Sequence, residues 1–359
     1  MRPRSEYKIK AIGLMSGTSL DGLDLVAAEF WKNNGKWDFN IAAAETENYE
    51  KNWTEQLKMA PALPGQQLIK LHVEYGRYLG QKTKAFIHKT RFKPELIASH
   101  GHTIFHQPEN GFTFQLGSSF EIAAINGITT VADFRSGDVA LGGQGAPLVP
   151  VGDKLLFSAF DYCLNLGGFA NISFDENNCR KAFDICPVNI VFNYFASKNG
   201  LLFDCNGNLG RIGNIDFILL EKLNSLDFYK KEPPKSLGRE WVESEFLPVL
   251  EKYDCSEPDK IRTVYEHVSQ QISKIAGNNG KLLITGGGAW NTFLIELIAA
   301  KSNIQITIPS PEIVDFKEAL VFAFLGTLRI QKAINCFASV TGAKHDHSAG
   351  VVFPAKISA

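Results

Sequence analysis

Three glycine-rich turns are the segments of this sequence best suited to bind a charged ligand. They are SGTSLDG at 16–22, LGGFAN at 166–171 and TGGGAWN at 285–291, and each follows an apolar stretch typical of a strand. Glycine lets backbone N–H groups converge on anionic oxygens, and the hydroxyls of Thr18 and Ser19 add donors. The turns together therefore indicate phosphate binding, although each alone is more typical of a hairpin that needs glycine for a positive φ.

These turns do not match the two commonest nucleotide-binding patterns. The first turn lacks the lysine of GxxxxGK[ST], because Leu23 follows Gly22. The third turn breaks GxGxxG, because Asn291 stands in the place of the last glycine. The folds that carry those loops are therefore excluded.

Three histidines offer a different chemistry. His100, His102 and His106 form the pattern HxHxxxH at the end of a predicted strand, which resembles the start of a metal-hydrolase site. The other histidines supply no convincing further ligands, and a metal hydrolase leaves the glycine turns without a role. A His-ligated metal hydrolase is therefore the weaker of the enzyme alternatives.

The elements that must position these residues alternate between strands and helices. In chain order, the apolar spacing predicts a hairpin over 10–30, a helix over 66–88, a strand over 95–102, a short strand over 112–116, a helix near 122–125, a strand ending at 134, a second hairpin over 161–174, a largely helical stretch over 189–274, a strand, glycine turn and helix over 281–301, and a helix within 311–330. This alternation is typical of an α/β protein whose sheets are covered by helices.

Length and composition predict two packed domains. A chain of 359 residues has room for about two domains of ~150 residues each, and 45% hydrophobic residues can fill both cores. The second hairpin repeats the first, which predicts two similar domains. We expect one domain over 1–130 plus about 335–359, and the other, with helical insertions, over 131–334.

Charge and cysteine usage exclude several partners. With 37 basic and 38 acidic side chains, the net charge of -1 offers no excess positive field for nucleic acid or an anionic membrane. The six cysteines contain no CxxC pair, so we expect reduced thiols. The first apolar stretch is too short for a signal peptide and no run of eighteen apolar residues occurs, so we expect a cytoplasmic protein.

Six stretches resemble the anhydro-N-acetylmuramic acid kinase family. They are MSGTSLDGLD at 15–24, ASHGHT at 98–103 with HQP at 106–108, VADFRSGDVALGGQGAPLVP at 131–150, NLGGFANI at 165–172, PPKSLGRE at 233–240 and TGGGAWN. They span nearly the whole chain, and MSGTSLDG and GGQGAPLVP are long and specific. The resemblance implies the fold of the actin, hexokinase and heat-shock-chaperone superfamily, in which two ribonuclease-H-like domains flank an ATP cleft.

The resemblance also implies an activity. The family consists of ATP-dependent sugar kinases of peptidoglycan recycling. They hydrolyse the 1,6-anhydro bond of 1,6-anhydro-N-acetylmuramic acid and phosphorylate the freed hydroxyl, which yields N-acetylmuramate 6-phosphate. A small-molecule substrate and a homodimer are the partners we expect.

The resemblance implies that Asp184 is the general base. The family motif FDTGPGN matches FDICPVN at 183–189, and Asp184, Pro187 and Asn189 are retained. A carboxylate can take a proton from water as that water attacks the anomeric carbon, while the departing oxygen attacks the γ-phosphate. Apart from the resemblance, Asp184 is equally typical of a turn residue or helix cap.

The motif departs from the family at three positions. Ile185, Cys186 and Val188 replace Thr, Gly and Gly. Side chains at these positions hinder close backbone contact with a sugar or phosphate, so we expect an effect on substrate range or activity. We expect Cys186 itself to be an inert packed thiol, because no histidine neighbours it in the sequence.

The resemblance assigns three residues to the sugar. Arg135 in DFRSGD suits the lactyl carboxylate of muramic acid, since a guanidinium binds a carboxylate through two parallel hydrogen bonds. An ion pair with Asp133 or Asp138 is the alternative role for this arginine. Glu318 is expected to orient sugar hydroxyls or to act as a partner of its helix dipole. His100 is the third expected sugar ligand.

The resemblance places the nucleotide on the glycine turns. The expected ATP-binding residues are Gly17, Thr18, Ser19, Leu20, Asp21, Gly22, Leu23 and Asp24 in the first turn, Gly167 and Gly168 in the second, and Gly286, Gly287 and Gly288 in the third. Mg²⁺ is implied because the phosphates need charge neutralisation during transfer, and Asp21 is a candidate to hold it through water. No further metal ligand follows from the sequence.

A third alternative keeps the fold without catalysis. The three replacements in the FDICPVN segment are also compatible with a sugar- or nucleotide-binding regulator that has lost its turnover.

Overall fold

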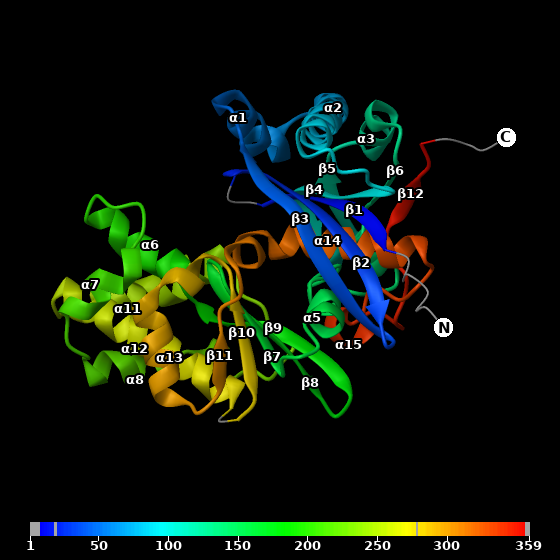
Figure 1. Ribbon diagram of the computed structural model, residues 1–359. Coiled ribbons are helices and arrows are strands. Elements are labelled where there is room, and N and C mark those ends of the chain that lie inside the picture. Colours follow the sequence, from blue (N-terminus) through cyan, green and yellow to red (C-terminus); the bar gives the residue numbers. More distant parts are fainter. Residues whose placement is uncertain (1–7, 18–19, 278, 356–359) are drawn as a thin grey trace. The chain divides into compact units, whose positions relative to one another are not determined.

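The computed structural model describes residues 8–17, 20–277 and 279–355, and the chain forms two compact units (Figure 1). Unit 1 comprises residues 1–156 and 316–359, and unit 2 comprises residues 157–315. The boundaries expected after residue 130 and before about residue 335 therefore both fall inside unit 1. The first would cut strand β6 (Thr129–Ala132), which is paired on both edges, with β4 on one side and β12 on the other.

The described part of unit 1 is built on a seven-stranded sheet with the order β12-β6-β4-β1-β2-β3, and β5 pairs with β4. Its strands are β1 (Ile9–Ser16), β2 (Gly22–Asn33), β3 (Lys36–Asn48), β4 (Leu96–Gln107), β5 (Phe112–Leu116), β6 and β12 (Val351–Phe353). Strands β1, β2 and β3 form an antiparallel meander, and β4 and β6 continue the sheet in parallel. The hairpin predicted over 10–30 is confirmed, because β1 pairs with β2 throughout.

Helices cover both faces of this sheet (Figure 1). They are α1 (Lys51–Met59), α2 (Gly65–Thr90), α3 (Ser119–Asn126), α4 (Ser136–Ala140), α5 (Pro150–Leu156), α15 (Ala338–Thr341) and the unit 1 part of α14 (Pro311–Ile330). Helices α2 and α3 share a hydrophobic core with one face of the meander. On the other face, the ring of Phe324 in α14 packs against Phe30 with 5.3 Å between centroids. A Cβ on Gly13 would collide with the carbonyl of Ala319, so only glycine lets α14 lie this close to β1.

Unit 2 repeats the strand plan of unit 1 with five strands, in the order β11-β10-β7-β8-β9. They are β7 (Tyr162–Leu166), β8 (Phe169–Glu176), β9 (Cys179–Pro187), β10 (Lys281–Thr285) and β11 (Gln305–Thr307). Strands β7, β8 and β9 form an antiparallel meander, and β10 and β11 run parallel to β7. This order and these directions match β6-β4-β1-β2-β3, so the expected pair of ribonuclease-H-like domains is confirmed.

The predicted helical region of unit 2 is also confirmed. It contains α6 (Asn189–Lys198), α7 (Asn208–Ile212), α8 (Phe217–Asn224), α9 (Asp227–Lys230), α10 (Arg239–Trp241), α11 (Leu247–Lys252) and α12 (Glu257–Ala276), and α13 (Thr292–Lys301) follows β10. Apolar side chains of α6, α8, α11, α12 and α13 form one core with the sheet. In the described ranges, no helix has the length and apolar character to cross a membrane.

Candidate active site

The carboxylate of Asp184 lies on β9 and is held on both oxygens. The backbone N–H of Leu237 donates to Oδ2 at 2.7 Å, and the side-chain amide of Asn171 on β8 donates to Oδ1. The N–H of Asp184 donates to the carbonyl of Lys235 at 3.0 Å, so the PPKSLGRE segment runs beside this residue. The side chain is partly exposed. Burial raises the pKa of the Asp184 carboxyl, and the two hydrogen bonds oppose that rise. A general base needs such a fixed carboxylate with solvent access.

Two asparagines extend this arrangement across the sheet. Asn171 is the cross-strand partner of both Asp184 and Asn165, and Nδ2 of Asn165 lies 3.5 Å from Oδ1 of Asn171. Neither asparagine was predicted from the sequence as a site residue. The pairing of the second hairpin could have found them, because residues at matching distances from a turn face each other in an antiparallel pair.

The glycines of unit 2 divide into packing positions and open positions. A Cβ on Gly286 would come within 2.5 Å of Oδ1 of Asn165, and one on Gly288 within 2.7 Å of the Leu166 side chain. These two glycines let the third turn lie against the end of β7. A Cβ on Gly287 would have nothing within 4 Å, and Gly168 is exposed. The open glycines are the ones that a phosphate or sugar could approach closely.

In the first turn, the structure describes only part of the expected phosphate loop. Thr18 and Ser19 lie outside the described residues. The N–H of Leu20 donates to the carbonyl of Gly17 at 3.3 Å, and Leu20 has a φ of 62°. The carboxylate of Asp21 is exposed beside this turn.

The remaining residues of the first turn have structural contacts within unit 1. A Cβ on Gly22 would lie 2.7 Å from the carbonyl of Glu47, so glycine permits the close pairing of β2 and β3. The Leu23 side chain is 1% exposed and belongs to the core, which leaves only its backbone to face a ligand. Asp24 accepts a hydrogen bond from Oγ1 of Thr46 at 2.6 Å.

His100 and Arg135 lie together in unit 1. Nε of Arg135 donates to Nε2 of His100 at 2.9 Å, and Nη1 donates to the carbonyl of Gly145 at 2.7 Å. Because Nε2 accepts, the ring proton is on Nδ1, which donates to the carbonyl of Gly101 at 2.9 Å. Burial and the positive charge of Arg135 place the pKa of His100 well below its usual range. His100 is thus neutral and orients the guanidinium, and no described residue accepts a hydrogen bond from Nη2 of Arg135.

Glu318 lies on α14 within electrostatic reach of the same group. Desolvation by the surrounding protein raises the pKa of its carboxyl. The positive charge of Arg135 lowers that pKa, and the negative charge of Asp24 raises it. The neighbouring Lys317 is buried and pairs with Asp153 at 2.7 Å. His100, Arg135 and Glu318, the three residues assigned to the sugar, therefore lie close together in unit 1. Asp24 is within electrostatic reach of Glu318.

The histidine pattern does not form a metal site. Nδ1 of His102 is hydrogen-bonded to Oγ of Ser16 at 2.9 Å, and Nδ1 of His106 lies 3.2 Å from Oγ1 of Thr113. Both ring nitrogens of His100 are already used. Across the described residues, the grouping of three potential metal ligands that does occur lies elsewhere and contains none of these histidines.

The sequence matches the family model for anhydro-N-acetylmuramic acid kinase over residues 9–355. The chain belongs to the anhydro-N-acetylmuramic acid kinase family. A relative of that name from Aliivibrio fischeri is 36% identical and covers 96% of this chain and 99% of its own. Another, from Mannheimia succiniciproducens, is 34% identical, covering 96% and 98%. A more distant likeness is the solved activator of 2-hydroxyisocaproyl-CoA dehydratase from Clostridium difficile with bound ADPNP, with a TM-score of 0.43, 14% identity and coverage of 90% and 97%.

The three side chains that depart from the kinase family motif are buried in the core of unit 2. Ile185, Cys186 and Val188 are 3%, 0% and 0% exposed and pack in the hydrophobic core of unit 2. Burial raises the pKa of the Cys186 thiol, as expected for an inert packed cysteine. The larger side chains therefore fill interior volume, while Asp184 beside them keeps its two hydrogen bonds.

A buried polar network that was not predicted from the sequence lies behind the first turn of this family member. Tyr49 donates to Oγ of Ser16 at 2.7 Å and lies 2.6 Å from the hydroxyl of Tyr75. His102 completes the network, and burial lowers its pKa to about 4. Ser16 is the last residue of β1, so the network fixes the point where the turn begins.

Proposed function

We propose that this protein is an ATP-dependent kinase that opens 1,6-anhydro-N-acetylmuramic acid by hydrolysis and phosphorylates it to N-acetylmuramate 6-phosphate. The observation that carries the proposal is the Asp184 carboxylate, held by Leu237 and Asn171 in a chain that matches the kinase family over residues 9–355.

In the proposed reaction Asp184 acts as the general base. A water molecule loses a proton to the carboxylate as its oxygen forms a bond to the anomeric carbon. The bond between that carbon and the bridging oxygen breaks, and the freed oxygen takes the γ-phosphoryl group as ADP leaves. The hydrogen bonds from Leu237 and Asn171 fix the carboxylate, so little reorganisation accompanies the proton transfer.

Arg135 is the proposed ligand of the lactyl carboxylate. Its Nε and Nη1 are held by His100 and Gly145, which orients the guanidinium and leaves Nη2 to meet the substrate. Glu318 is proposed to accept hydrogen bonds from the sugar. Desolvation and the negative charge of Asp24 raise the pKa of this carboxyl, and the positive charge of Arg135 lowers it.

ATP is the proposed phosphoryl donor, and its phosphates would meet the glycine turns. The open faces of Gly168 and Gly287 fit this role, because backbone can approach a phosphate only where no Cβ intervenes. Mg²⁺ would neutralise phosphate charge when bound. The exposed carboxylate of Asp21 offers the oxygen that this ion prefers. From the family alone we also propose a cytoplasmic role in peptidoglycan recycling. We propose a homodimer as well, and light scattering can check this oligomeric state.

The test is product formation by wild type and Asp184→Asn. The proteins are incubated with ATP, Mg²⁺ and the anhydro-sugar, and the phosphosugar is measured by mass spectrometry. We expect wild type to form product and Asp184→Asn to retain folding and ATP binding but lose turnover by on the order of 10³-fold. Glu176→Gln, on the exposed end of β8, is the matched control and should behave as wild type. Near-normal turnover by Asp184→Asn would refute the assignment of the base.

A further inference from the structure

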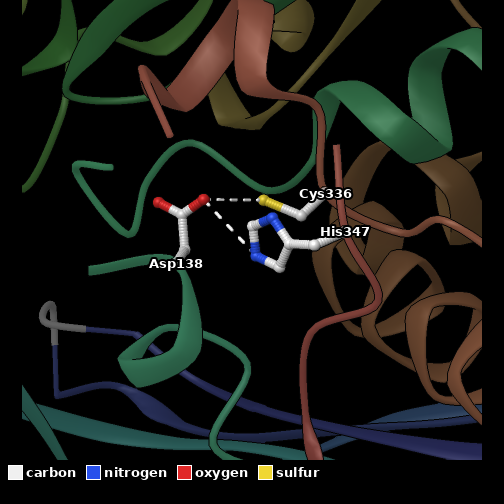
Figure 2. Close-up of side chains that lie close together, drawn as sticks. All are labelled: Asp138, Cys336 and His347. Carbon is white, nitrogen blue, oxygen red and sulfur yellow. Dashed lines mark hydrogen bonds and ion pairs between the residues drawn. The ribbon is translucent and has the colours of Figure 1, made fainter. Parts of the chain in front are cut away.

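A second group of reactive side chains lies in unit 1, outside the residues proposed for catalysis. Asp138 of α4, Cys336 and His347 direct one ligand atom each toward a common point (Figure 2). Sγ of Cys336 lies 3.1 Å from Oδ1 of Asp138, and Nε2 of His347 lies 3.6 Å from the same oxygen. All three ligand atoms lie within 4.8 Å of one another.

The protonation of His347 makes this arrangement unusual. Its Nδ1 lies 3.2 Å from the carbonyl of His345, and a carbonyl only accepts, so Nδ1 carries a proton. Nε2 is buried without a hydrogen-bond partner, and the side chain is 10% exposed. In the neutral ring, the lone pair of Nε2 therefore faces a carboxylate oxygen that also holds lone pairs. A cation between the two atoms would satisfy both lone pairs.

The loop around Asp138 is built to hold the carboxylate in this place. Oδ2 accepts a hydrogen bond from the N–H of Gly145 at 2.7 Å, and Oδ1 accepts one from Oγ1 of Thr341 at 2.7 Å. A Cβ on Gly143 would collide with the carboxylate, so glycine is needed for the loop to wrap it. Asp138 is 0% exposed. Two glycines of the GGQG stretch at 142–145, Gly143 and Gly145, thus contact this carboxylate.

Cys336 and His347 are presented to Asp138 by a rigid backbone contact. Each donates its N–H to the carbonyl of the other at 3.1 Å, which forms an isolated β-bridge. The bridge fixes the spacing of the thiol and the imidazole before any ion arrives. Lys344, His345 and Asp346, which lie between them in the chain, are exposed, so the chain reaches the surface directly before His347.

We propose that Asp138, Cys336 and His347 bind a zinc ion. Sulfur, imidazole nitrogen and carboxylate oxygen are the donors that Zn²⁺ prefers, and tetrahedral bonds of about 2.0–2.3 Å separate ligand atoms by about 3.3–3.8 Å. The distances of 3.1 and 3.6 Å need only small side-chain shifts to meet this. The carbonyl of His345 fixes the second ring nitrogen, as is usual for zinc-bound histidine.

Zinc binding would release the thiol proton and link two segments of unit 1. Zn²⁺ forms a bond to the sulfur, the thiol proton leaves to solvent, and a water molecule takes the fourth position. The ion would tie the segment around 336–347 to the loop around Asp138. Gly145 connects this loop to the sugar residues, because its N–H binds Asp138 and its carbonyl binds Arg135. Zinc would therefore stabilise the loop that holds Arg135.

Metal stoichiometry and cobalt spectroscopy on the full chain test the proposal. Chelator-treated protein is dialysed against Zn²⁺ and the bound metal is measured. We expect one zinc per chain in wild type and a loss of at least tenfold in affinity for Cys336→Ser and His347→Ala. Cys179→Ser, on β9 of unit 2, and His345→Ala, two residues before His347, alter exposed residues of the same types and should keep the metal.

Cobalt substitution needs no variant and covers the case of a variant that does not fold. Co²⁺-loaded wild type should show the thiolate-to-cobalt charge-transfer absorption and the intense visible bands of a tetrahedral site. Zinc that remains bound in folded Cys336→Ser, or cobalt-loaded wild type without a thiolate band, would overturn the proposal.

Discussion

Each unit places a polar pair at the same register of its own sheet, but the carboxylate lies on the middle strand in unit 1 and on the outer strand in unit 2. In unit 1, Asp24 on the middle strand β2 faces Thr46 on β3 and accepts its hydroxyl hydrogen bond. In unit 2, Asn171 on the middle strand β8 faces Asp184 on β9 and donates to it. Both middle-strand residues occupy the second pair from the hairpin turn.

This difference separates what the backbone provides from what the side chains add. The repeated meander fixes where a polar pair lies, and the residue types decide which strand carries the negative charge. The carboxylate of the outer strand, Asp184, receives a backbone N–H from Leu237. Asp24 lies within electrostatic reach of Glu318. We therefore expect unit 2 to control turnover and unit 1 to control sugar binding.

Exchanging the pair of unit 2 should have the largest effect. In the double variant Asn171→Asp with Asp184→Asn, the carboxylate moves to the middle strand, as in unit 1. Neighbouring strands lie about 4.8 Å apart, so the base no longer reaches the attacking water. We expect kcat to fall on the order of 10³-fold, as for Asp184→Asn alone, measured by ADP release. A kcat within about tenfold of wild type would mean that the carboxylate can act from either strand.

Arg135→Lys should affect sugar binding rather than turnover. Lysine lacks the planar guanidinium that binds His100 and Gly145 and still directs Nη2 at a carboxylate. We expect the KM for the anhydro-sugar to rise about 10- to 100-fold with a smaller change in kcat, measured in steady-state assays. Arg77→Lys, in an exposed ion pair with Glu121, is the control. An unchanged KM combined with a lower kcat would contradict the division of roles between the units.

Buried histidines should make both units less stable in acid. Burial lowers the pKa of His102 in unit 1 to about 4 and that of His267 in unit 2 to about 3. The unfolded chain therefore binds these protons first. Each contribution is complete above about pH 6.5 and declines as the pH falls toward the folded pKa.

Urea denaturation at two pH values measures this effect. Between about pH 7 and pH 5, each histidine should remove about 2 kcal/mol from the free energy of unfolding. His102→Gln and His267→Gln should each reduce that decline, while exposed His88→Gln should not. If neither buried variant alters the pH dependence, these rings are not neutral in the folded protein.

Asn171→Ala should produce the smallest effect, on the pH profile. The Asn171 amide lowers the pKa of Asp184 against the effect of burial, so its loss raises that pKa further. Because the base must be ionised, the acidic limb of kcat/KM should move upward by roughly half a unit to one unit. Asn110→Ala, on an exposed turn of unit 1, should leave the limb in place. A downward shift would show that the amide does not stabilise the ionised form.

Local patterns predicted much of the fold. The 10–30 and 161–174 hairpins and the helix over 66–88 follow from turn glycines and apolar spacing, because these depend on residues near one another in the chain. The domain boundaries did not follow in the same way. Strand β6 belongs to unit 1 through its pairing with β4 and β12, and such pairing leaves no mark in its own four residues.

The sequence by itself determined the repeated strand plan and the kinase family and selected Asp184 as the candidate base, because hairpin turns and contiguous motifs are local in the chain. Only the tertiary structure decided that Asn171 faces Asp184 and that Ile185, Cys186 and Val188 enter the core, since both depend on register and packing. It also brought Cys336 to Asp138 across 198 positions of sequence. Contacts over such distances are fixed when helices and strands pack around a shared core, and no local pattern encodes them.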